Sequence, residues 1–363
     1  MAQFKHSDVK GKILTVNGLI EPNDLGKTIC HEHLFIDFRV VYQDPPLKED
    51  NKKSLEKVSL ENLGWIRNYW NSNKDNLVLD SYEDSLFELN DFKKYGNSIV
   101  ELTSMGSIRL KKHAERLKLL SNATDLNIIL GSGFYVDNSL PEEFKKKNEK
   151  EISEIIISDF FNPANKISSG VIGEIGCSYP LTENEKKSLK ASAIAQEQTG
   201  ASIIIHPGRN ENSPFEIIEF LKKEDANIER IVIGHIERTI YSVDKLNELA
   251  SENVYMNFDQ LGIESSYYPL NRKSYMPNDY QKINFIKHLV EKGYSNKILL
   301  GHDIYSKHRL KKYGGHGYSY ILEMILLRMQ DYGITKKDID NMIIKNPKNI
   351  LTLIWNLIFW WFI

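Results

Sequence analysis

Cysteine is scarce in this sequence, because Cys30 and Cys177 are the only two among 363 residues. Two cysteines in a chain of this length cannot form a disulfide framework, which is typical of small secreted domains. The first twelve residues are polar and lack the apolar core of a secretory signal. These observations predict a cytoplasmic protein in a reducing compartment.

The sequence also lacks an excess of charge of either sign. Lysine and arginine number 47 and aspartate and glutamate 49, a formal net charge of -2. Nucleic acids and anionic membranes are usually bound by clusters of positive charge, so neither is an expected partner. Hydrophobic residues make up 41% of the chain, with no low-complexity stretch, so the chain has enough apolar side chains for a large core.

Long hydrophobic runs are missing except at the end of the chain, where residues 350–363 read ILTLIWNLIFWWFI. This run is too short to span a bilayer without tilt and too apolar for a free tail in water. We expect residues 1–350 to form a single domain and residues 351–363 to be a hydrophobic tail. Two explanations fit that tail equally: it packs on the protein or on a partner, or the terminus is not authentic. Membrane contact is the least favoured alternative.

Short runs rich in β-forming residues alternate with helical segments along the chain. The eight runs are 28–37, 98–105, 127–135, 170–175, 201–206, 230–236, 254–260 and 297–304. Most are continuously apolar, which is typical of parallel strands covered on both faces. The alternation predicts an α/β protein with a (β/α)8 TIM barrel fold rather than a doubly wound sheet.

Turn residues and helix-terminating residues around these strands predict the remaining elements. Residues 12–19 read as strand, turn and strand, a small N-terminal β-hairpin cap on the barrel. Helices are expected at 183–199, 278–292, 318–332 and 335–345, the third apolar on all sides and therefore buried, the last stopping before Pro347. Long loops at 38–63 and 262–277 should lie on the catalytic face.

Two histidines in the first strand form the motif HEH. Side chains alternate along a strand, so His31 and His33 should point to one face and Glu32 to the other. His206, His235 and Asp303 each end a later strand, and strand ends of a barrel meet at one rim. Burying these groups together without a partner would be costly, and divalent metal removes that cost.

Glu174 is the only ionisable side chain of the fourth strand, GVIGEIG. A carboxylate between two cations can give one oxygen to each, so Glu174 indicates a centre of two divalent cations rather than one. An ion pair with a basic residue in the core is the alternative reading. Zinc suits histidine-rich ligation, and manganese, cobalt or iron would also accept these ligands.

Several spaced motifs then resemble the phosphotriesterase family of the amidohydrolase superfamily, most closely its phosphotriesterase-related branch. They are HEH, GEIG, HPGRN, GHIERT and GHDI, in strand order, and the resemblance runs from about residue 16 to 350. It implies that His31, His33 and Asp303 hold the more buried metal. It also implies that His206 and His235 hold the more exposed one and that Glu174 bridges the two.

The resemblance has one departure and several functional implications. True phosphotriesterases bridge their metals with a carbamylated lysine, whereas Glu174 stands here, which disfavours an organophosphate substrate. The related branch implies hydrolysis of amides of small N-acyl amino acids or N-acyl taurines, such as N-acetyltaurine to taurine and acetate. A homodimer is implied only by the same resemblance.

The expected mechanism is hydrolysis by a hydroxide that bridges the two metals, since bound metal lowers the pKa of water from about 15.7 towards 7. Asp303 would take the proton on attack and pass it to the leaving group. Cys177 has no neighbouring base motif, so a nucleophilic role is not expected. His302 should face away from Asp303 and make a core hydrogen bond.

Candidate substrate contacts are Tyr135, Arg209, Arg238 and Lys307, which offer one hydroxyl and several cations near strand ends. Together they favour a small anionic substrate, such as a carboxylate or sulfonate. The loop tyrosines at 267, 268 and 275 could line an acyl pocket. Three alternatives remain for the function: a lactone or phosphate ester hydrolase, a non-catalytic metal-stabilised barrel that acts as a binding protein, and a single-metal deaminase.

Overall fold

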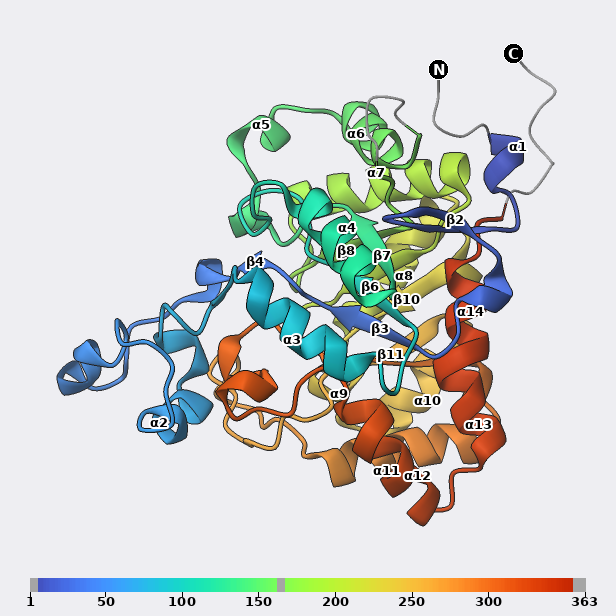
Figure 1. Ribbon diagram of the computed structural model, residues 1–363. Coiled ribbons are helices and arrows are strands. Elements are labelled where there is room, and N and C mark those ends of the chain that lie inside the picture. Colours follow the sequence, from blue (N-terminus) through green and yellow to red (C-terminus); the bar gives the residue numbers. More distant parts are fainter. Residues whose placement is uncertain (1–5, 162–166, 355–363) are drawn as a thin grey trace.

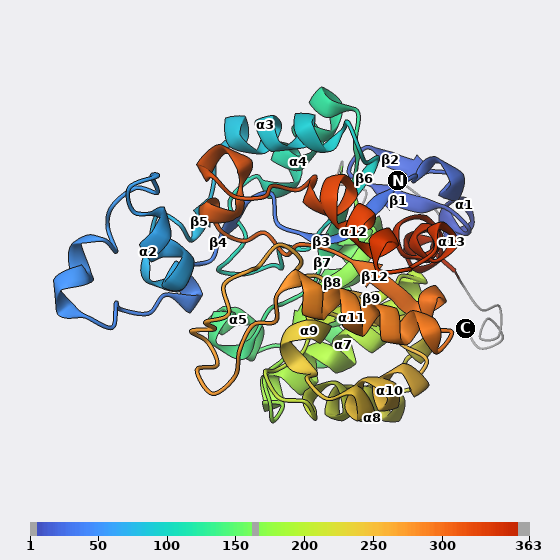
Figure 2. The ribbon, with the colours of Figure 1, turned by 90° about the horizontal axis from the view of Figure 1, so that it is seen from below.

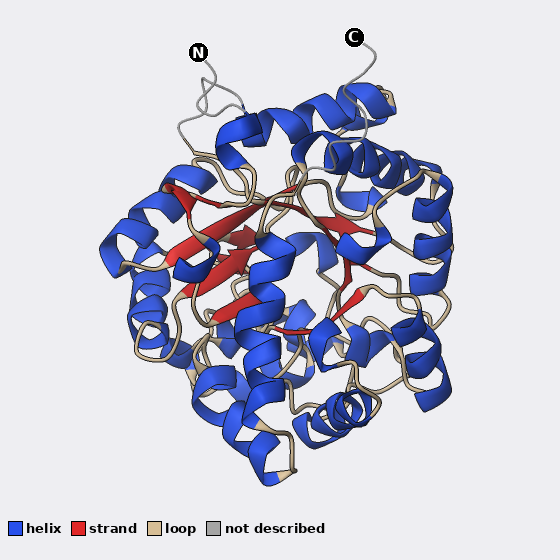
Figure 3. Cartoon of the chain, turned by 90° about the vertical axis from the view of Figure 1, so that its right-hand side faces the viewer, coloured by secondary structure: helices blue, strands red, loops and turns tan. Residues whose placement is uncertain are grey.

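Eight parallel strands form the central sheet of the computed structural model, which describes residues 6–161 and 167–354 (Figure 3). The strands are β3 (Thr28–Glu32), β6 (Ser98–Glu101), β7 (Asn127–Ser132), β8 (Val171–Gly176), β9 (Ile203–His206), β10 (Ile231–Ile233), β11 (Tyr255–Phe258) and β12 (Ile298–Leu300). Each pairs with the next in chain order. The sheet curls until β12 meets β3, where the Asp303 N–H donates to the His31 carbonyl oxygen at 3.0 Å.

Helices cover the outside of this sheet, which gives the predicted (β/α)8 barrel (Figures 1 and 3). They include α3 (Tyr82–Phe92), α4 (His113–Thr124), α6 (Glu149–Phe161), α7 (Glu183–Thr199), α8 (Ser213–Lys223), α10 (Val243–Ser251), α11 (Asp279–Glu291), α12 (Leu326–Asp331), α13 (Lys336–Asp340) and α14 (Asn346–Leu351). Shorter helices are α1 (His6–Val9), α2 (Leu63–Asn68), α5 (Glu142–Lys145) and α9 (Ile236–Thr239). No helix of the described chain is both long enough and apolar enough to cross a bilayer.

The predicted strands are present but several are shorter than expected. The first run stops at Glu32, and its last residues form a separate strand, β4 (Ile36–Asp37), which pairs antiparallel with β5 (Val78–Leu79). The strand of the second run stops at Glu101, and a bridge between Met105 and Phe134 continues the pairing beyond it. Apolar content predicts where a strand is buried, but the pairing partner decides where it ends.

The N-terminal hairpin is confirmed as β1 (Ile13–Thr15) and β2 (Gly18–Ile20). Its Val16 N–H donates to the Ile128 carbonyl oxygen at 2.9 Å, which fixes the hairpin beside β7. The Leu353 N–H donates to the Lys12 carbonyl oxygen at 2.9 Å and the Ile354 N–H to the Gly200 carbonyl oxygen at 3.0 Å, so this described part of the tail packs on the protein. The rest of the expected hydrophobic tail, 355–363, lies outside the described residues.

Helix termini confirm two of the predicted helices. Thr182 and Glu185 form a reciprocal capping box at the start of α7, and Gly200 ends it with a φ of 68°. Asn278 and Gln281 form the same box at the start of α11. Each box satisfies backbone N–H groups that the helix itself cannot bond.

Two helix predictions are wrong in detail. The 318–332 segment is not buried on all sides, since Met324 and Leu327 are 42% and 58% exposed. The 335–345 helix does not stop before Pro347, because helical structure continues through a π turn (Asn341–Lys345) into α14. Pro347 follows this π turn inside the continuous helix and has no N–H to donate to the preceding turn.

Glycines allow β7, β8 and β9 to approach one another closely. A Cβ atom added to Gly131 would lie 2.2 Å from the Gly173 carbonyl oxygen, and one added to Gly173 would lie 2.6 Å from the Ile204 carbonyl oxygen. Gly173 also has a φ of 142°, which disfavours other residues. Glu174 follows directly, so its backbone is fixed by these contacts.

Residues 38–77 project from one side of the barrel and carry α2 (blue, left in Figures 1 and 2). The loops at 38–63, which belongs to this segment, and at 262–277, after β11, were both predicted to lie on the catalytic face. Phe38 from the first and Tyr268 and Leu270 from the second line the same pocket, in agreement with that placement, and Trp70 from beyond residue 63 lines it too.

Candidate active site

The six predicted metal ligands lie together at the carboxyl ends of the strands. None is more than 5% exposed. They are His31, His33, Glu174, His206, His235 and Asp303. They fall into two groups, His31–His33–Asp303 and Glu174–His206–His235, and within each group the candidate ligand atoms lie within 4.8 Å of one another.

One group joins the first strand to the last. His33 Nε2 is 3.1 Å from Asp303 Oδ1, and His31 Nε2 is 3.7 Å from the same oxygen. A second group surrounds Glu174, whose Oε1 is 3.1 Å from His206 Nδ1 and 3.0 Å from His235 Nε2. Glu174 Oε1 is also 3.5 Å from His31 Nε2 and so lies between the two groups.

The unpaired nitrogen of His31 bears on whether these residues could bind a cation. His31 Nε2 is buried and has no hydrogen-bond partner among the described residues, although its ring is held in place from the Nδ1 side. Burial lowers the pKa of His31, but the carboxylates of Glu174, Asp259 and Asp303 raise it to about 10. This excess of negative charge around a free ring nitrogen fits divalent metal.

Asp259 is a member of the site that the sequence analysis missed. Its Oδ2 lies 2.8 Å from His31 Nδ1, and its Oδ1 lies 2.7 Å from His235 Nδ1. A carboxylate in this position fixes the ring so that the other nitrogen faces the cluster. The signal was present, because Asp259 lies at the end of the seventh predicted strand, as Asp303 does at the end of the eighth.

A second chain of contacts supports His33. Its Nδ1 is 2.9 Å from the Thr103 hydroxyl, which donates to Glu101 Oε1 at 2.6 Å. His113 Nε2 is 2.9 Å from the other Glu101 oxygen. Burial raises the pKa of Glu101, but His113 and the further hydrogen bonds lower it to about 2. The order of these partners could not be read from the sequence.

His235 and Asp303 both have left-handed backbone, each with a φ of 53°. Non-glycine residues rarely adopt this conformation, and such residues concentrate at functional sites. Each lies just beyond a barrel strand, where the turn aims its side chain into the cluster.

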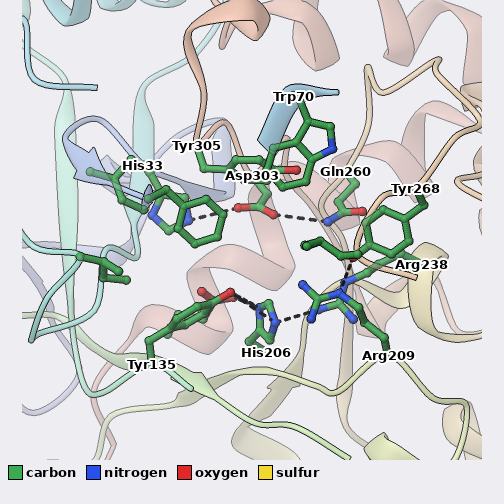
Figure 4. A pocket seen from close by; sticks show the side chains of 15 residues that line it. His33, Trp70, Tyr135, His206, Arg209, Arg238, Gln260, Tyr268, Asp303 and Tyr305 are labelled. Atoms are coloured by element: carbon green, nitrogen blue, oxygen red, sulfur yellow. Dashed lines mark hydrogen bonds and ion pairs between the residues drawn. The ribbon is translucent and has the colours of Figure 1, made fainter. Parts of the chain in front are cut away.

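The cluster forms the floor of a pocket that aromatic side chains enclose (Figure 4). Trp70, Tyr268 and Tyr305 separate this pocket from an outer cavity of about 610 Å³ and line both. The inner pocket retains only about 20 Å³, close to the space of one water molecule. Binding of any larger molecule therefore requires these side chains to move.

Three of the four predicted substrate contacts line the inner pocket. The Tyr135 hydroxyl is 3.4 Å from both ring nitrogens of His206, and Arg238 Nη2 is 3.1 Å from His206 Nε2. Arg209 Nε donates to the Tyr268 hydroxyl at 2.7 Å. Lys307 is the exception.

Lys307 lies outside the inner pocket. Its Nζ is 2.7 Å from Asp75 Oδ1, a partner from the projecting 38–77 segment. The three loop tyrosines also lie in different places. Tyr268 lines the inner pocket, Tyr267 lines the outer cavity and Tyr275 is 45% exposed. A loop residue's position depends on long-range packing that local sequence does not encode.

Arg209 and Arg238 bring positive charge to the pocket, and neither forms an ion pair with a described carboxylate. Arg238 is 1% exposed and Arg209 is partly buried. Burial alone would raise the pKa of the Tyr268 phenol, but the two arginines lower it below its usual value. The pocket therefore has two unneutralised guanidinium groups beside the histidine cluster, a typical anion site.

Glu32 and His302 were predicted to point away from the ligands on their strands, and they do. Glu32 points away from the cluster, and its Oε1 is 2.5 Å from His302 Nδ1. His302 therefore makes a core contact. Cys177 is buried, and burial raises its thiol pKa, so it is not activated as a nucleophile.

Comparison with known proteins agrees with this geometry. The model of the phosphotriesterase family matches residues 11–351. The phosphotriesterase-related protein of Nematostella vectensis is 43% identical over 348 residues, covering 94% of this chain and 99% of that protein. The chain belongs to the phosphotriesterase family.

Other known proteins are also similar to this member of the phosphotriesterase family. The N-acetyltaurine hydrolase of Dictyostelium discoideum is 41% identical over 367 residues, covering 95% of this chain and 98% of that protein. A resiniferatoxin-binding protein from Rhodobacter sphaeroides has a TM-score of 0.89 at 29% identity, covering 94% of this chain and 96% of its own. As a member of the phosphotriesterase family, this protein is a metal-dependent hydrolase, as its ligand pattern predicts.

Proposed function

We propose that this enzyme hydrolyses the amide bond of small anionic N-acyl compounds, with N-acetyltaurine, cleaved to taurine and acetate, as the preferred substrate. The observation that carries the proposal is the pair of unneutralised guanidinium groups, Arg209 and Arg238, beside the histidine cluster. A sulfonate or carboxylate can bind them while the amide lies over the cluster. The names of several relatives support the same substrate.

We propose that two divalent cations, most suitably zinc, occupy the cluster. His31, His33 and Asp303 would hold one and His206 and His235 the other, with Glu174 shared between them. When bound, such cations activate water at neutral pH and polarise a carbonyl oxygen. Nitrogen and carboxylate ligands of this kind suit zinc.

The side chains around the cluster have separate roles in the reaction. A bond forms between the water oxygen and the acyl carbon while the carbon–nitrogen bond breaks. Asp303 is placed to accept the water proton and return it to the departing nitrogen, since its carboxylate lies at the pocket floor. Arg209 and Arg238 would hold the anionic end and so fix the amide over Asp303.

Neutral phosphotriesters and lactones are the competing substrates. They would leave both guanidinium groups of Arg209 and Arg238 without an anionic partner in a pocket with little water. We therefore expect them to be poorer substrates than an N-acyl sulfonate. The substrate's negative charge, rather than the barrel, distinguishes the two classes.

The test is a substrate panel on enzyme loaded with zinc, manganese or cobalt. N-acetyltaurine should release taurine, quantified by mass spectrometry, with a higher kcat/KM than a γ-lactone or an aryl phosphotriester. The uncharged amide N-ethylacetamide, which lacks only the sulfonate, is the matched control and should react poorly. Turnover of the lactone or phosphotriester with none of N-acetyltaurine would contradict the proposal.

A further inference from the structure

Gln260 occupies the space between the catalytic carboxylate and the two arginines (Figure 4). It follows β11 and is 4% exposed. Its Nε2 is 3.4 Å from Asp303 Oδ2. Its Oε1 is buried and has no hydrogen-bond partner in the described chain.

The orientation of this amide is set by its neighbour. Rotating the group by 180° would place Oε1 of Gln260 against the carboxylate of Asp303, with two acceptors in contact and no donor. The NH2 group must therefore face Asp303, and the carbonyl oxygen lies on the side of the amide away from Asp303. Buried carbonyl oxygens almost always have a donor partner, so this one, on a residue that lines the pocket, is available to accept from a bound ligand.

Buried charges hold the backbone of Gln260 in place. Its N–H donates to Glu237 Oε1 at 2.7 Å, and its carbonyl oxygen accepts from Lys282 Nζ at 2.7 Å. Lys282 is fully buried and pairs with Asp279 at 3.0 Å. Because both backbone groups are bound, the side chain projects into the pocket from a rigid support.

We infer that Gln260 Oε1 accepts a hydrogen bond from the N–H of the scissile amide and so selects amides over esters. The inference rests on the proposed function. Secondary amides have an N–H at this position, whereas esters, lactones and phosphotriesters have an oxygen that cannot donate. The nitrogen of an N-acyl sulfonate must lie between the reacting carbon and the anionic end, which is where Gln260 lies between Asp303 and Arg238.

This contact also suits the proton transfer. With its hydrogen held by Gln260, the nitrogen has its lone pair free to take the proton from Asp303 as the carbon–nitrogen bond breaks. An ester in the same place would put an oxygen lone pair against the carbonyl oxygen of Gln260 and leave that oxygen unpaired. Gln260 is thus a specificity-determining residue.

A matched pair of substrates isolates the contact. N-acetyltaurine and the acetyl ester of isethionate share the acyl group and the sulfonate, and differ only in N–H against oxygen. In Gln260→Met, loss of the Nε2 contact with Asp303 affects both substrates, but loss of Oε1 affects only the amide. The ratio of kcat/KM for amide over ester should fall roughly 10- to 100-fold relative to wild type.

Gln260→Glu is the complementary variant. It keeps an acceptor oxygen but sets a second carboxylate against Asp303, so both rates should fall while the ratio changes less than about threefold. If Gln260→Met does not accumulate as folded protein, Gln260→Asn is the substitute. Its side chain is shorter by one methylene group, which moves the carbonyl oxygen away from the substrate, so the amide-to-ester ratio should fall in the same way. Metal content and melting temperature identify the variants that remain folded.

The outcomes separate this inference from the proposed function. An unchanged amide-to-ester ratio in folded Gln260→Met, with wild type active on both compounds, would overturn the role of Gln260 alone. Wild-type enzyme that cleaves neither compound after metal loading would overturn the proposed function and the role of Gln260 with it.

Discussion

Asp259 bonds His235 twice through one oxygen, since Oδ1 accepts from the backbone N–H at 2.9 Å and lies 2.7 Å from Nδ1 of the ring. The double contact fixes both the left-handed backbone of His235 and the direction of its ring. With Nδ1 engaged, Nε2 is the nitrogen that faces Glu174. One carboxylate therefore sets the geometry of a ligand contributed by another strand.

Asp259→Asn should weaken metal binding more than it weakens folding. An amide presents an NH2 group to one of the two rings that Asp259 now orients, so that ring loses its acceptor. We expect metal affinity to fall roughly 10- to 100-fold, measured by competition with a chelator, and activity to recover at higher metal concentration.

Asp159→Asn is the matched control for this variant, because Asp159 bonds Ser132 and is absent from the candidate metal groups. It should leave the metal affinity unchanged. Equal affinities for wild type and Asp259→Asn would show that Asp259 does not orient the ligands.

Glu174→Gln should change the number of bound ions. If Glu174 shares its oxygens between two cations, its amide can no longer bridge them, and native mass spectrometry should report about one ion per chain instead of two. Hydrolysis should fall on the order of a hundredfold or more. Glu185→Gln alters a buried glutamate that caps α7 and should retain the wild-type metal content. A single ion in wild-type protein would contradict the bridged centre.

Arg209→Met should reduce recognition of charged substrates only. Removing one charge-assisted hydrogen bond should lower kcat/KM for N-acetyltaurine roughly 10- to 100-fold and leave that for N-ethylacetamide nearly unchanged. Lys307→Met is the matched loss of a cation, and it should alter neither rate because Lys307 pairs with Asp75 outside the inner pocket. A parallel loss on both substrates in Arg209→Met would instead indicate damage to the site as a whole.

Glu88 should make stability depend on pH. Its carboxyl group on α3 is 1% exposed, and burial raises its pKa from 4.5 to about 7 despite a hydrogen bond from the Lys312 N–H. The unfolded chain releases this proton at lower pH than the folded chain, so stability should fall as pH rises from about 4.5 to 7 and then level off.

Glu88→Gln should remove that fall. The difference in free energy of unfolding between variant and wild type should grow by about 2–3 kcal/mol from acidic to neutral pH, measured by urea denaturation. Glu142→Gln, at an exposed glutamate, should show no such trend. A constant difference across the range would mean that Glu88 titrates normally in the folded protein.

The barrel and its central ligands could be predicted because they follow from local rules. Apolar runs mark buried strands, and parallel strands bring their ends to one rim, so His206 and Asp303 could be placed together from their positions alone. Glu174 was identifiable because an isolated carboxylate in an apolar strand needs a partner.

Features that depend on distant partners could not be predicted. Lys307 and Asp75 are 232 residues apart, and nothing near either residue signals the pair. Asp259 and Gln260 occupy strand-end positions that the same rule covers, but their roles depend on which side chains the neighbouring strands present. Pro347 appeared to be a helix stop because the π turn that precedes it has no sequence signature of its own.

The glycine contacts of β7 and β8 have a consequence for how this enzyme can diversify. A methyl group at Gly131 or Gly173 would collide with backbone rather than with a movable side chain, so the sheet beneath Glu174 tolerates no substitution there. New substrate preferences must then arise from the segments above the rim, such as those carrying Trp70 and Tyr268. A mutational library confined to those segments should yield altered selectivity with the hydrolytic chemistry intact.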